Sequence, residues 1–331
     1  MTAALLSVRD LRVEFATRKG PLVALDGVSF AIAPGEVLGI VGESGAGKSL
    51  TGLAIIGLLD PPGRVSGGEI RLEGERIDDL APARMREIRG RRIGIIFQDP
   101  LTSLNPLLRI GDQLTETILT HKAVTRKQAR ERAVAWLGEV GIPSPEQRID
   151  GYPHEFSGGM RQRVVIALAL CAEPALVIAD EPTTALDVSV QAQIIAVLKN
   201  LTRKHGAAVM LITHDMGVIA ETADRVGVMY AGRIVEIGEV GDLVRNPLHP
   251  YAQGLMAAIP TLETRARRLA QIPGAMPRLS AIPRGCAFAP RCPKAFGRCV
   301  ERPPLLAVGD RSAACWLYEQ REAPVLAGFP R

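Results

Sequence analysis

The sequence has little of several features that would narrow its function. Aromatic residues make up only 4% of the 331 positions, so few rings are present on which single-stranded nucleic acid could stack. No apolar run approaches the roughly 18 residues of a membrane span, and the longest, residues 164–172, ends at Glu173. The first ten residues lack the basic and apolar segments of a secretory signal. We therefore expect the chain to stay in the cytoplasm.

Positive charge, proline and cysteine are concentrated near the C-terminus. The net charge is +5, but residues 260–331 hold twelve Lys/Arg against five Asp/Glu, ten of the 24 prolines and four of the five cysteines. This change in composition predicts a main domain at residues 1–259 and a C-terminal extension at residues 260–331. A basic face can bind nucleic acid or a membrane surface, but it is more commonly a solvated face.

The strongest motif lies between an apolar strand at residues 37–41 and an apolar helical run at residues 50–59. Its spacing is G-x-x-x-x-G-K-S, in which glycines let backbone N–H groups surround a phosphate and a helix N-terminus faces the same anion. Lys48 is expected to reach the β- and γ-phosphates, and Ser49 to bind Mg²⁺. The nucleotide-binding candidates here are Gly42, Glu43, Ser44, Gly45, Ala46, Gly47, Lys48 and Ser49.

The residues around this loop predict a small antiparallel sheet and a buried strand. Residues 5–15 and 27–33 read as two strands of an antiparallel edge, and residues 68–74 as a further short strand. Phe15 is a candidate for stacking on adenine, although a phenylalanine at a strand end is equally well explained as core. A helix is predicted at residues 82–89.

A second candidate for the nucleotide site, Gln98, follows the apolar strand at residues 92–97. Gln98 stands where a buried parallel strand would deliver its C-terminal end to a nucleotide, and its amide can reach Mg²⁺ or the attacking water. Most glutamines at strand ends are merely solvated. Residues 110–120 and 126–138 are helical in pattern, with no strand before residue 175. An insertion of this size, at about residues 99–172, predicts a helical subdomain that docks on another protein.

A second anion site is predicted where Phe-Ser-Gly-Gly-Met-Arg-Gln-Arg, residues 156–163, begins a long helix. Ser157, Gly158 and Gly159 would present backbone N–H groups at that helix N-terminus. Two phosphate sites for one nucleotide indicate a dimer. The alternative is an ordinary serine N-cap followed by flexible glycines.

Two further strands end in residues suited to hydrolysis. The strand at residues 176–181 ends in Asp180, which would hold Mg²⁺ through a water, and Glu181, which would orient or deprotonate the attacking water. The strand at residues 209–213 ends at His214, which is placed to bond the γ-phosphate, although a lone histidine is usually structural or solvated.

Together these residues resemble the ATP-binding subunit of ABC transporters, over about residues 5–259. Six motifs occur in the family's order: the loop at residues 42–49, Gln98, the signature at residues 157–159, Asp180 with Glu181, Ala185-Leu186-Asp187, and His214. The resemblance implies an α/β fold, that of an ABC-type P-loop ATPase with a RecA-like core, an antiparallel β subdomain and a helical signature subdomain. It also implies ATP and Mg²⁺ as cofactors. The family closes two subunits head to tail, each ATP lying between one chain's phosphate loop and the other's signature. The resemblance also implies that Asp187 is a nucleotide-binding residue.

Three stretches of the sequence indicate which branch of the family the chain resembles. Phe156 and Met160 replace the leucine and glutamine of the commonest signature, and residues 97–106 and 246–251 resemble dipeptide and oligopeptide importers. Nickel and glutathione importers share this branch. The resemblance implies an ATPase on the cytoplasmic face of the membrane, with two permease subunits, a homologous second ATPase subunit and an extracytoplasmic solute-binding protein. A non-transport ABC ATPase acting on nucleic acid is the rival, disfavoured because the chain has one set of motifs and its clustered cysteines lie beyond them.

The extension contains Cys286, Cys292, Cys299 and Cys315, with gaps of five, six and fifteen residues. Disulfides are disfavoured in a cytosolic chain, and the closely spaced pairs typical of zinc sites are absent, whereas irregular gaps permit an iron–sulfur cluster. The branch resemblance points to a [4Fe–4S] cluster, ranked above zinc and above free thiols. Because these cysteines lie far in sequence from every phosphate-binding motif, we expect the site to be structural, with basic neighbours. Those neighbours are Arg284, Arg291, Lys294, Arg298 and Arg311; Cys171 is expected in the core.

Overall fold

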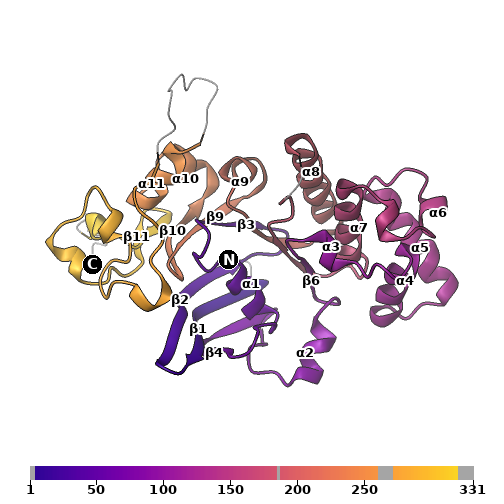
Figure 1. The fold of residues 1–331 in the computed structure, drawn as a ribbon, viewed down its shortest axis with the longest axis horizontal. Coiled ribbons are helices and arrows are strands. Elements are labelled where there is room, and N and C mark those ends of the chain that lie inside the picture. Colours follow the sequence, from indigo (N-terminus) through magenta and orange to yellow (C-terminus); the bar gives the residue numbers. More distant parts are fainter. Residues whose placement is uncertain (1–3, 185–186, 260–270, 320–331) are drawn as a thin grey trace, which may run out of the picture.

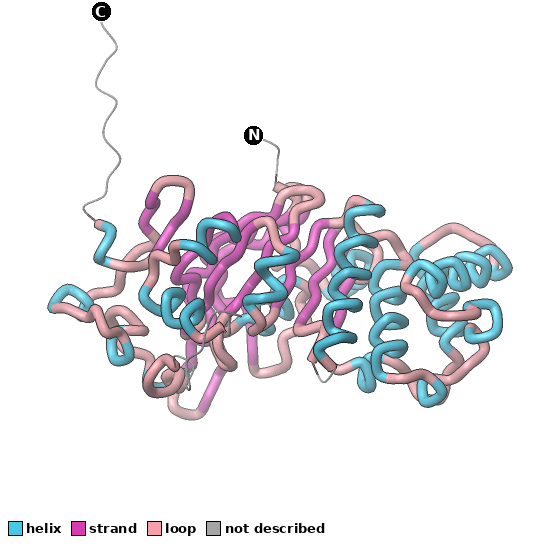
Figure 2. Tube along the Cα trace, turned by 90° about the horizontal axis from the view of Figure 1, so that it is seen from above, coloured by secondary structure: helices cyan, strands magenta, loops and turns pink. Residues whose placement is uncertain are grey.

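A computed structural model describes residues 4–184, 187–259 and 271–319 of the chain. A central mixed sheet lies between a helical part on one side and the C-terminal extension on the other, with a small antiparallel sheet beside it (Figure 1). The view from above shows the helical part and the extension at opposite ends of an elongated molecule (Figure 2). No helix within these described ranges is long and apolar enough to cross a membrane.

The small sheet is antiparallel throughout, as the sequence predicted. Its order is β2-β1-β4-β5. The strands are β1 (Leu6–Thr17), β2 (Gly20–Ile32), β4 (Gly63–Leu72) and β5 (Glu75–Arg76). Leu6 and Val8, and then Leu11 and Val13, face the core and are at most 1% exposed; between Val8 and Leu11 the alternation is interrupted, because the pairing of β1 with β2 shifts register there. This alternation follows from the pleat, which turns successive side chains to opposite faces.

The main sheet has the order β11-β12-β10-β9-β3-β8-β7-β6 within the described residues. Its parallel strands are β3 (Val37–Val41), β6 (Ile93–Ile96), β7 (Leu176–Asp180), β8 (Ala208–Ile212) and β9 (Arg225–Tyr230). The antiparallel strands are β10 (Arg233–Glu239), β11 (Leu306–Val308) and β12 (Arg311–Ala313). Because β3, β6, β7 and β8 run parallel, their C-terminal ends meet at one edge of the sheet, where ligands bind in open α/β sheets.

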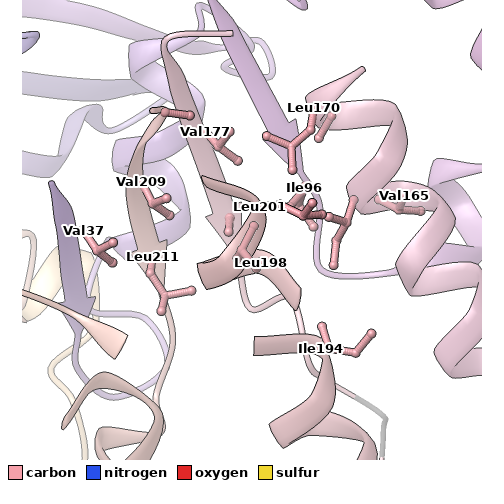
Figure 3. Close-up of a cluster of buried hydrophobic side chains, with 14 of the residues drawn as sticks. Val37, Ile96, Val165, Leu170, Val177, Ile194, Leu198, Leu201, Val209 and Leu211 are labelled. Carbon is pink, nitrogen blue, oxygen red and sulfur yellow. The ribbon is translucent and has the colours of Figure 1, made fainter. Parts of the chain in front are cut away.

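The central strands are buried on both faces, which explains their continuous apolar sequences. Val177, Val209 and Leu211 belong to one hydrophobic cluster, whereas Ile178 and Met210, their neighbours along the strands, belong to another. The first cluster is covered by helices α7 (Gly158–Leu170) and α8 (Val188–His205), whose side chains meet the sheet in Figure 3. The second lies toward the antiparallel sheet and helix α1 (Lys48–Ile55).

The predicted helical subdomain lies between β6 and β7. It comprises α3 (Pro100–Ser103), α4 (Ile110–His121), α5 (Arg126–Glu139), α6 (Pro145–Arg148), η1 (Pro153–Glu155) and α7. Helix α5 begins at a capping box, in which the Thr125 side chain and the Gln128 side chain each accept from the other residue's backbone N–H. Trp136 of α5 and Leu114 of α4 are buried in the same core.

The C-terminal extension is continuous with the main sheet. β12 pairs with β10, and β11 adds one further strand. The remaining helices are α2 (Pro82–Ile88), α9 (Met216–Thr222), α10 (Val240–Arg245), α11 (Pro250–Ala257), η2 (Leu279–Ala281), η3 (Ala289–Arg291), η4 (Gly297–Val300) and η5 (Trp316–Tyr318). The predicted boundary near residue 260 therefore separates two parts of the sequence that share one sheet.

Candidate active site

The loop at residues 42–49 joins β3 to α1 and needs glycine at several positions. Gly42 and Gly47 have φ of 153° and 105°, a region that side chains of L-residues rarely adopt. A Cβ on Gly42 would lie 2.3 Å from the Met229 carbonyl oxygen, and one on Gly47 would lie 2.7 Å from a methyl carbon of Leu25. The loop can therefore bring its backbone N–H groups around an anion only with glycine at these positions.

Lys48 is folded back onto this loop. Its ammonium donates to the carbonyl oxygens of Gly42 at 2.8 Å and of Glu43 at 3.2 Å, and the residue is 5% exposed. Burial lowers the pKa of Lys48, and the nearby charges of Glu181 and Asp180 oppose that shift. The ammonium is thus held at the base of the loop, where a phosphate would be its counterion.

A hydrogen bond joins Ser49, in the phosphate loop, to Asp180, at the end of β7. The Ser49 hydroxyl donates to Oδ1 of Asp180 at 2.9 Å. Burial raises the pKa of Asp180, the neighbouring Glu181 raises it further, and the Ser49 hydrogen bond opposes both. A hydroxyl and a carboxylate are oxygen ligands of the kind Mg²⁺ takes, and a cation would offset the cost of burying Asp180 beside another acid. These residues therefore fit the expected ion.

The three expected catalytic residues lie together around the Glu181 carboxylate. Gln98 Nε2 donates to Oε2 at 3.1 Å, and His214 Nδ1 lies 3.3 Å from Oε1. Thr184, which the sequence reasoning missed, donates its hydroxyl to Oε2 at 2.9 Å. Glu181 itself has φ of 45°, an uncommon conformation for a residue other than glycine. The carboxylate is thus fixed by three side chains at the edge where β6, β7 and β8 end.

A cavity of about 770 Å³ joins these groups, a size suited to a nucleotide. Phe15, the candidate for adenine stacking, lies in its wall together with the phosphate loop and the catalytic residues. The lining residues are Phe15, Ala24, Glu43, Ser44, Gly45, Ala46, Gly47, Lys48, Ser49, Leu50, Gln98, Glu181, His214 and Leu279. Leu279 belongs to the C-terminal extension and was not expected here.

The signature residues do not line this cavity. Ser157 caps α7 by accepting from the Met160 N–H at 3.4 Å, and it is exposed, as is Gly158, while Gly159 is half-buried. Asp187 precedes α8 and is also exposed. Ala185 and Leu186 lie outside the described residues. The chain's two predicted anion sites are therefore separate.

The cysteine site gains no support as a metal centre. Among the described ranges, no three or more His, Cys, Asp or Glu side chains are grouped to hold a metal ion. The thiols do share one neighbourhood, because burial raises the pKa of Cys315 to about 11 and the charges of Cys286, Cys292 and Cys299 raise it too. Cys171 is buried, as expected.

The basic residues of the extension have partners other than the thiols. Arg298 lies over the Trp316 ring and pairs with Glu319, and Lys294 donates to Gln253 at 2.8 Å. Arg311 donates to the backbone of α10 and to the Asn246 carbonyl oxygen that follows it. A fourth of the expected basic neighbours, Arg291, binds Glu43 of the phosphate loop. The extension therefore contacts the phosphate loop, although its cysteines lie far in sequence from every phosphate-binding motif.

Comparison with known proteins agrees with this geometry. Residues 25–184 match the family described as ABC transporter, and residues 235–299 match the oligopeptide/dipeptide transporter C-terminal region. The fold is similar to the ATP-binding cassette MJ0796, solved as a dimer bound to ADP and Pi, with a TM-score of 0.63 and 30% identity over 71% of this chain and 98% of that one.

Curated relatives match over nearly the whole length. The oligopeptide transport ATP-binding protein AppD of Bacillus subtilis is 47% identical over 97% of this chain and 99% of its own. The dipeptide transport ATP-binding protein DppD of the same species is 48% identical over 98% of both chains. The oligopeptide transport ATP-binding protein OppD of Salmonella typhimurium is 49% identical over 94% of this chain and 93% of its own. The chain therefore belongs to the ABC transporter ATP-binding proteins and carries the C-terminal region of oligopeptide and dipeptide transporters.

Proposed function

We propose that this chain hydrolyses ATP to drive the import of dipeptides or oligopeptides through partner permeases. The observation that carries the hydrolytic part is the meeting of Gln98, Glu181 and His214 beside the phosphate loop. The peptide substrate rests on the relatives, which are named for oligopeptide and dipeptide transport. Nickel or glutathione import by the same branch remains the alternative.

The residues around the cavity have different roles in ATP hydrolysis. Lys48 and the loop N–H groups would bind the β- and γ-phosphates, and Ser49 with Asp180 would hold Mg²⁺, which would neutralise charge on the phosphates. Glu181 accepts a proton from the attacking water, and Gln98 and His214 keep its carboxylate oriented toward that water. Proton acceptance at this position explains why one carboxylate is held by several side chains.

We place the second phosphate contact in another subunit. Ser157 and Gly158 are exposed and outside the cavity that holds the phosphate loop, so a second ATPase chain is needed to bring a signature to each ATP. The branch favours a homologous partner over a second copy. Purification of the native complex tests this assembly: two different ATPase chains are expected, and two copies of this chain with no other ATPase would contradict the heterodimer.

The surface next to Gln98 fits a permease. Leu101 and Leu107 are 62% and 83% exposed, and Leu101 lines a cavity of about 670 Å³ between α3, α4 and α7. Exposed apolar side chains around a hollow are typical of protein contacts. Binding here would place the chain on the cytoplasmic face of the membrane, and the solute-binding protein would act on the opposite side. The described residues that line this cavity include no aromatic side chain on which the nucleic acid of the rival function could stack.

We retain the [4Fe–4S] cluster as a proposal for the four C-terminal thiols. Cys286 donates its backbone N–H to the Cys299 carbonyl oxygen at 3.0 Å, which keeps these two loops together. A four-iron cluster takes cysteine thiolates as its four ligands, and four cysteines lie in this extension. Anaerobically purified protein should contain iron and acid-labile sulfide. One zinc per chain, or four titratable thiols without metal, would contradict the cluster.

Transport itself is tested in cells that lack the transporter. The chain, expressed with partner permeases and a solute-binding protein, should restore uptake of a labelled dipeptide, and the Glu181→Gln variant should not. Uptake of labelled nickel or glutathione in place of the dipeptide would move the assignment to the alternative. Duplex-DNA binding with a steep salt dependence would favour the nucleic-acid rival.

A further inference from the structure

One ion pair connects the C-terminal extension to the phosphate loop. Arg291, the last residue of η3, places Nη1 at 2.7 Å from Oε2 of Glu43 and Nη2 at 2.9 Å from Oε1. This is the two-pronged geometry in which arginine binds a carboxylate most specifically. The Arg291 side chain is 7% exposed, so water competes little with the contact.

The same loop residue is also held through its backbone. The Glu43 N–H donates to the hydroxyl of Tyr251 in α11 at 2.8 Å. Tyr251 is 0% exposed, and its ring packs at 4.7 Å from that of Tyr230, whose hydroxyl lies 3.4 Å from Arg291 Nη1. The position of Glu43 is therefore set from two directions by groups that lie C-terminal to the main ATPase motifs.

Arg291 also fastens the segment that reaches the nucleotide cavity. Its Nε donates to the Pro273 carbonyl oxygen at 2.8 Å, and Nη2 to that of Ile272 at 3.3 Å. This segment leads to η2, whose first residue, Leu279, lines the cavity. One guanidinium thus joins a wall of the cavity to the loop at its base.

The charge on Glu43 gives this contact a consequence for ATP. Glu43 is the first x of the G-x-x-x-x-G-K-S loop, which is expected to hold a triphosphate. An unpaired carboxylate at this position would repel the negatively charged phosphates. Pairing with Glu43 raises the pKa of Arg291, so the guanidinium stays charged. We propose that Arg291 is a positioning residue for ATP binding, which neutralises Glu43 and ties the cysteine-bearing extension to the phosphate loop.

Single variants of the full-length chain give the first test. In Arg291→Ala, the KM for ATP should rise about tenfold, as expected for loss of a hydrogen-bonded charge, while kcat at saturating ATP stays within about twofold because Glu181 is untouched. Arg291→Lys keeps the charge and should lose less than Arg291→Ala. Lys294→Ala is the matched control, since it removes an exposed positive charge from the same segment, and its KM should equal that of the wild type.

The double variant distinguishes the effect of the unpaired Glu43 charge from a general loosening of the structure around Arg291. Glu43→Gln added to Arg291→Ala removes the unpaired carboxylate, so the KM should fall back toward the wild-type value. A merely structural role for Arg291 would make the double variant as poor as, or poorer than, Arg291→Ala. Unchanged KM in Arg291→Ala, or an equal rise in Lys294→Ala, would overturn the proposal. If Arg291→Ala does not fold, Arg291→Gln and Arg291→Lys, each with and without Glu43→Gln, provide the same comparison.

Discussion

The side-chain amide of Gln98 donates to the Glu181 carboxylate across 3.1 Å, although the two residues are 83 positions apart. Gln98 follows β6, and α3 with the exposed Leu101 begins two residues later. A partner that presses on α3 would therefore act next to the side chain that holds the Glu181 carboxylate. This short connection gives a physical route by which permease contact and hydrolysis can influence each other.

Replacing Glu181 by glutamine should stop turnover without preventing nucleotide binding. The amide keeps the shape of the side chain but cannot accept the proton of the attacking water, so kcat should fall by roughly 10²- to 10⁴-fold. Asp180 and Ser49, the proposed Mg²⁺ ligands, are unchanged in this variant. Steady-state hydrolysis and ATP binding, measured on the same preparation, check the two expectations separately.

Replacing Lys48 by alanine should act on binding instead. The ammonium is lost from the base of the loop, and ATP affinity should fall roughly ten- to a hundredfold, the effect of losing a hydrogen bond to a charged group. Titration with a labelled ATP analogue measures it. An equal loss of affinity in Glu181→Gln and Lys48→Ala would show that the two residues do not have different roles.

The buried His249 should make the fold sensitive to acid. Burial lowers the pKa of its imidazole to about 3, and Nδ1 accepts from the Tyr251 N–H at 3.0 Å, which requires a neutral ring. The unfolded chain takes up a proton near pH 6.5 and the folded chain does not, so stability should decrease as the pH falls from about 6.5 toward 3.

The variant His249→Asn isolates this effect. An asparagine oxygen can also accept at a helix N-cap, but it does not titrate. Glu236, whose side chain accepts from the backbone N–H groups of Leu248 and His249, is present in both proteins. Denaturant unfolding at several pH values should give a steeper pH dependence in the wild type, by up to about 1.4 kcal/mol per pH unit. Parallel curves would contradict the prediction.

The core under the main sheet should not tolerate truncation. Leu211 of β8 is 0% exposed and belongs to the helix-covered cluster (Figure 3), so Leu211→Ala should lower the unfolding free energy by about 2–5 kcal/mol. Leu107→Ala, at an 83% exposed position, is the matched control and should change it by less than about 0.5 kcal/mol. Similar losses of thermal stability in both variants would contradict this assignment of the core.

The sequence by itself determined the parts of this protein that depend on local pattern. The loop at residues 42–49, the apolar strands before Gln98 and Asp180, and the helices of the subdomain between β6 and β7 are all specified by neighbouring residues, through glycine spacing and hydrophobic periodicity. Their order along the chain was enough to indicate the family, because six motifs seldom occur together in the right sequence by accident.

Only the tertiary structure decided how distant segments meet. The contact of Arg291 with Glu43 spans 248 positions, and β12 joins β10 rather than forming a separate unit. Tyr251 stood within a recognised motif, yet its hydrogen bond to Glu43 could not be read from spacing. Such contacts are made between side chains whose positions are set by the packing of several elements at once, so no local pattern in the sequence encodes them.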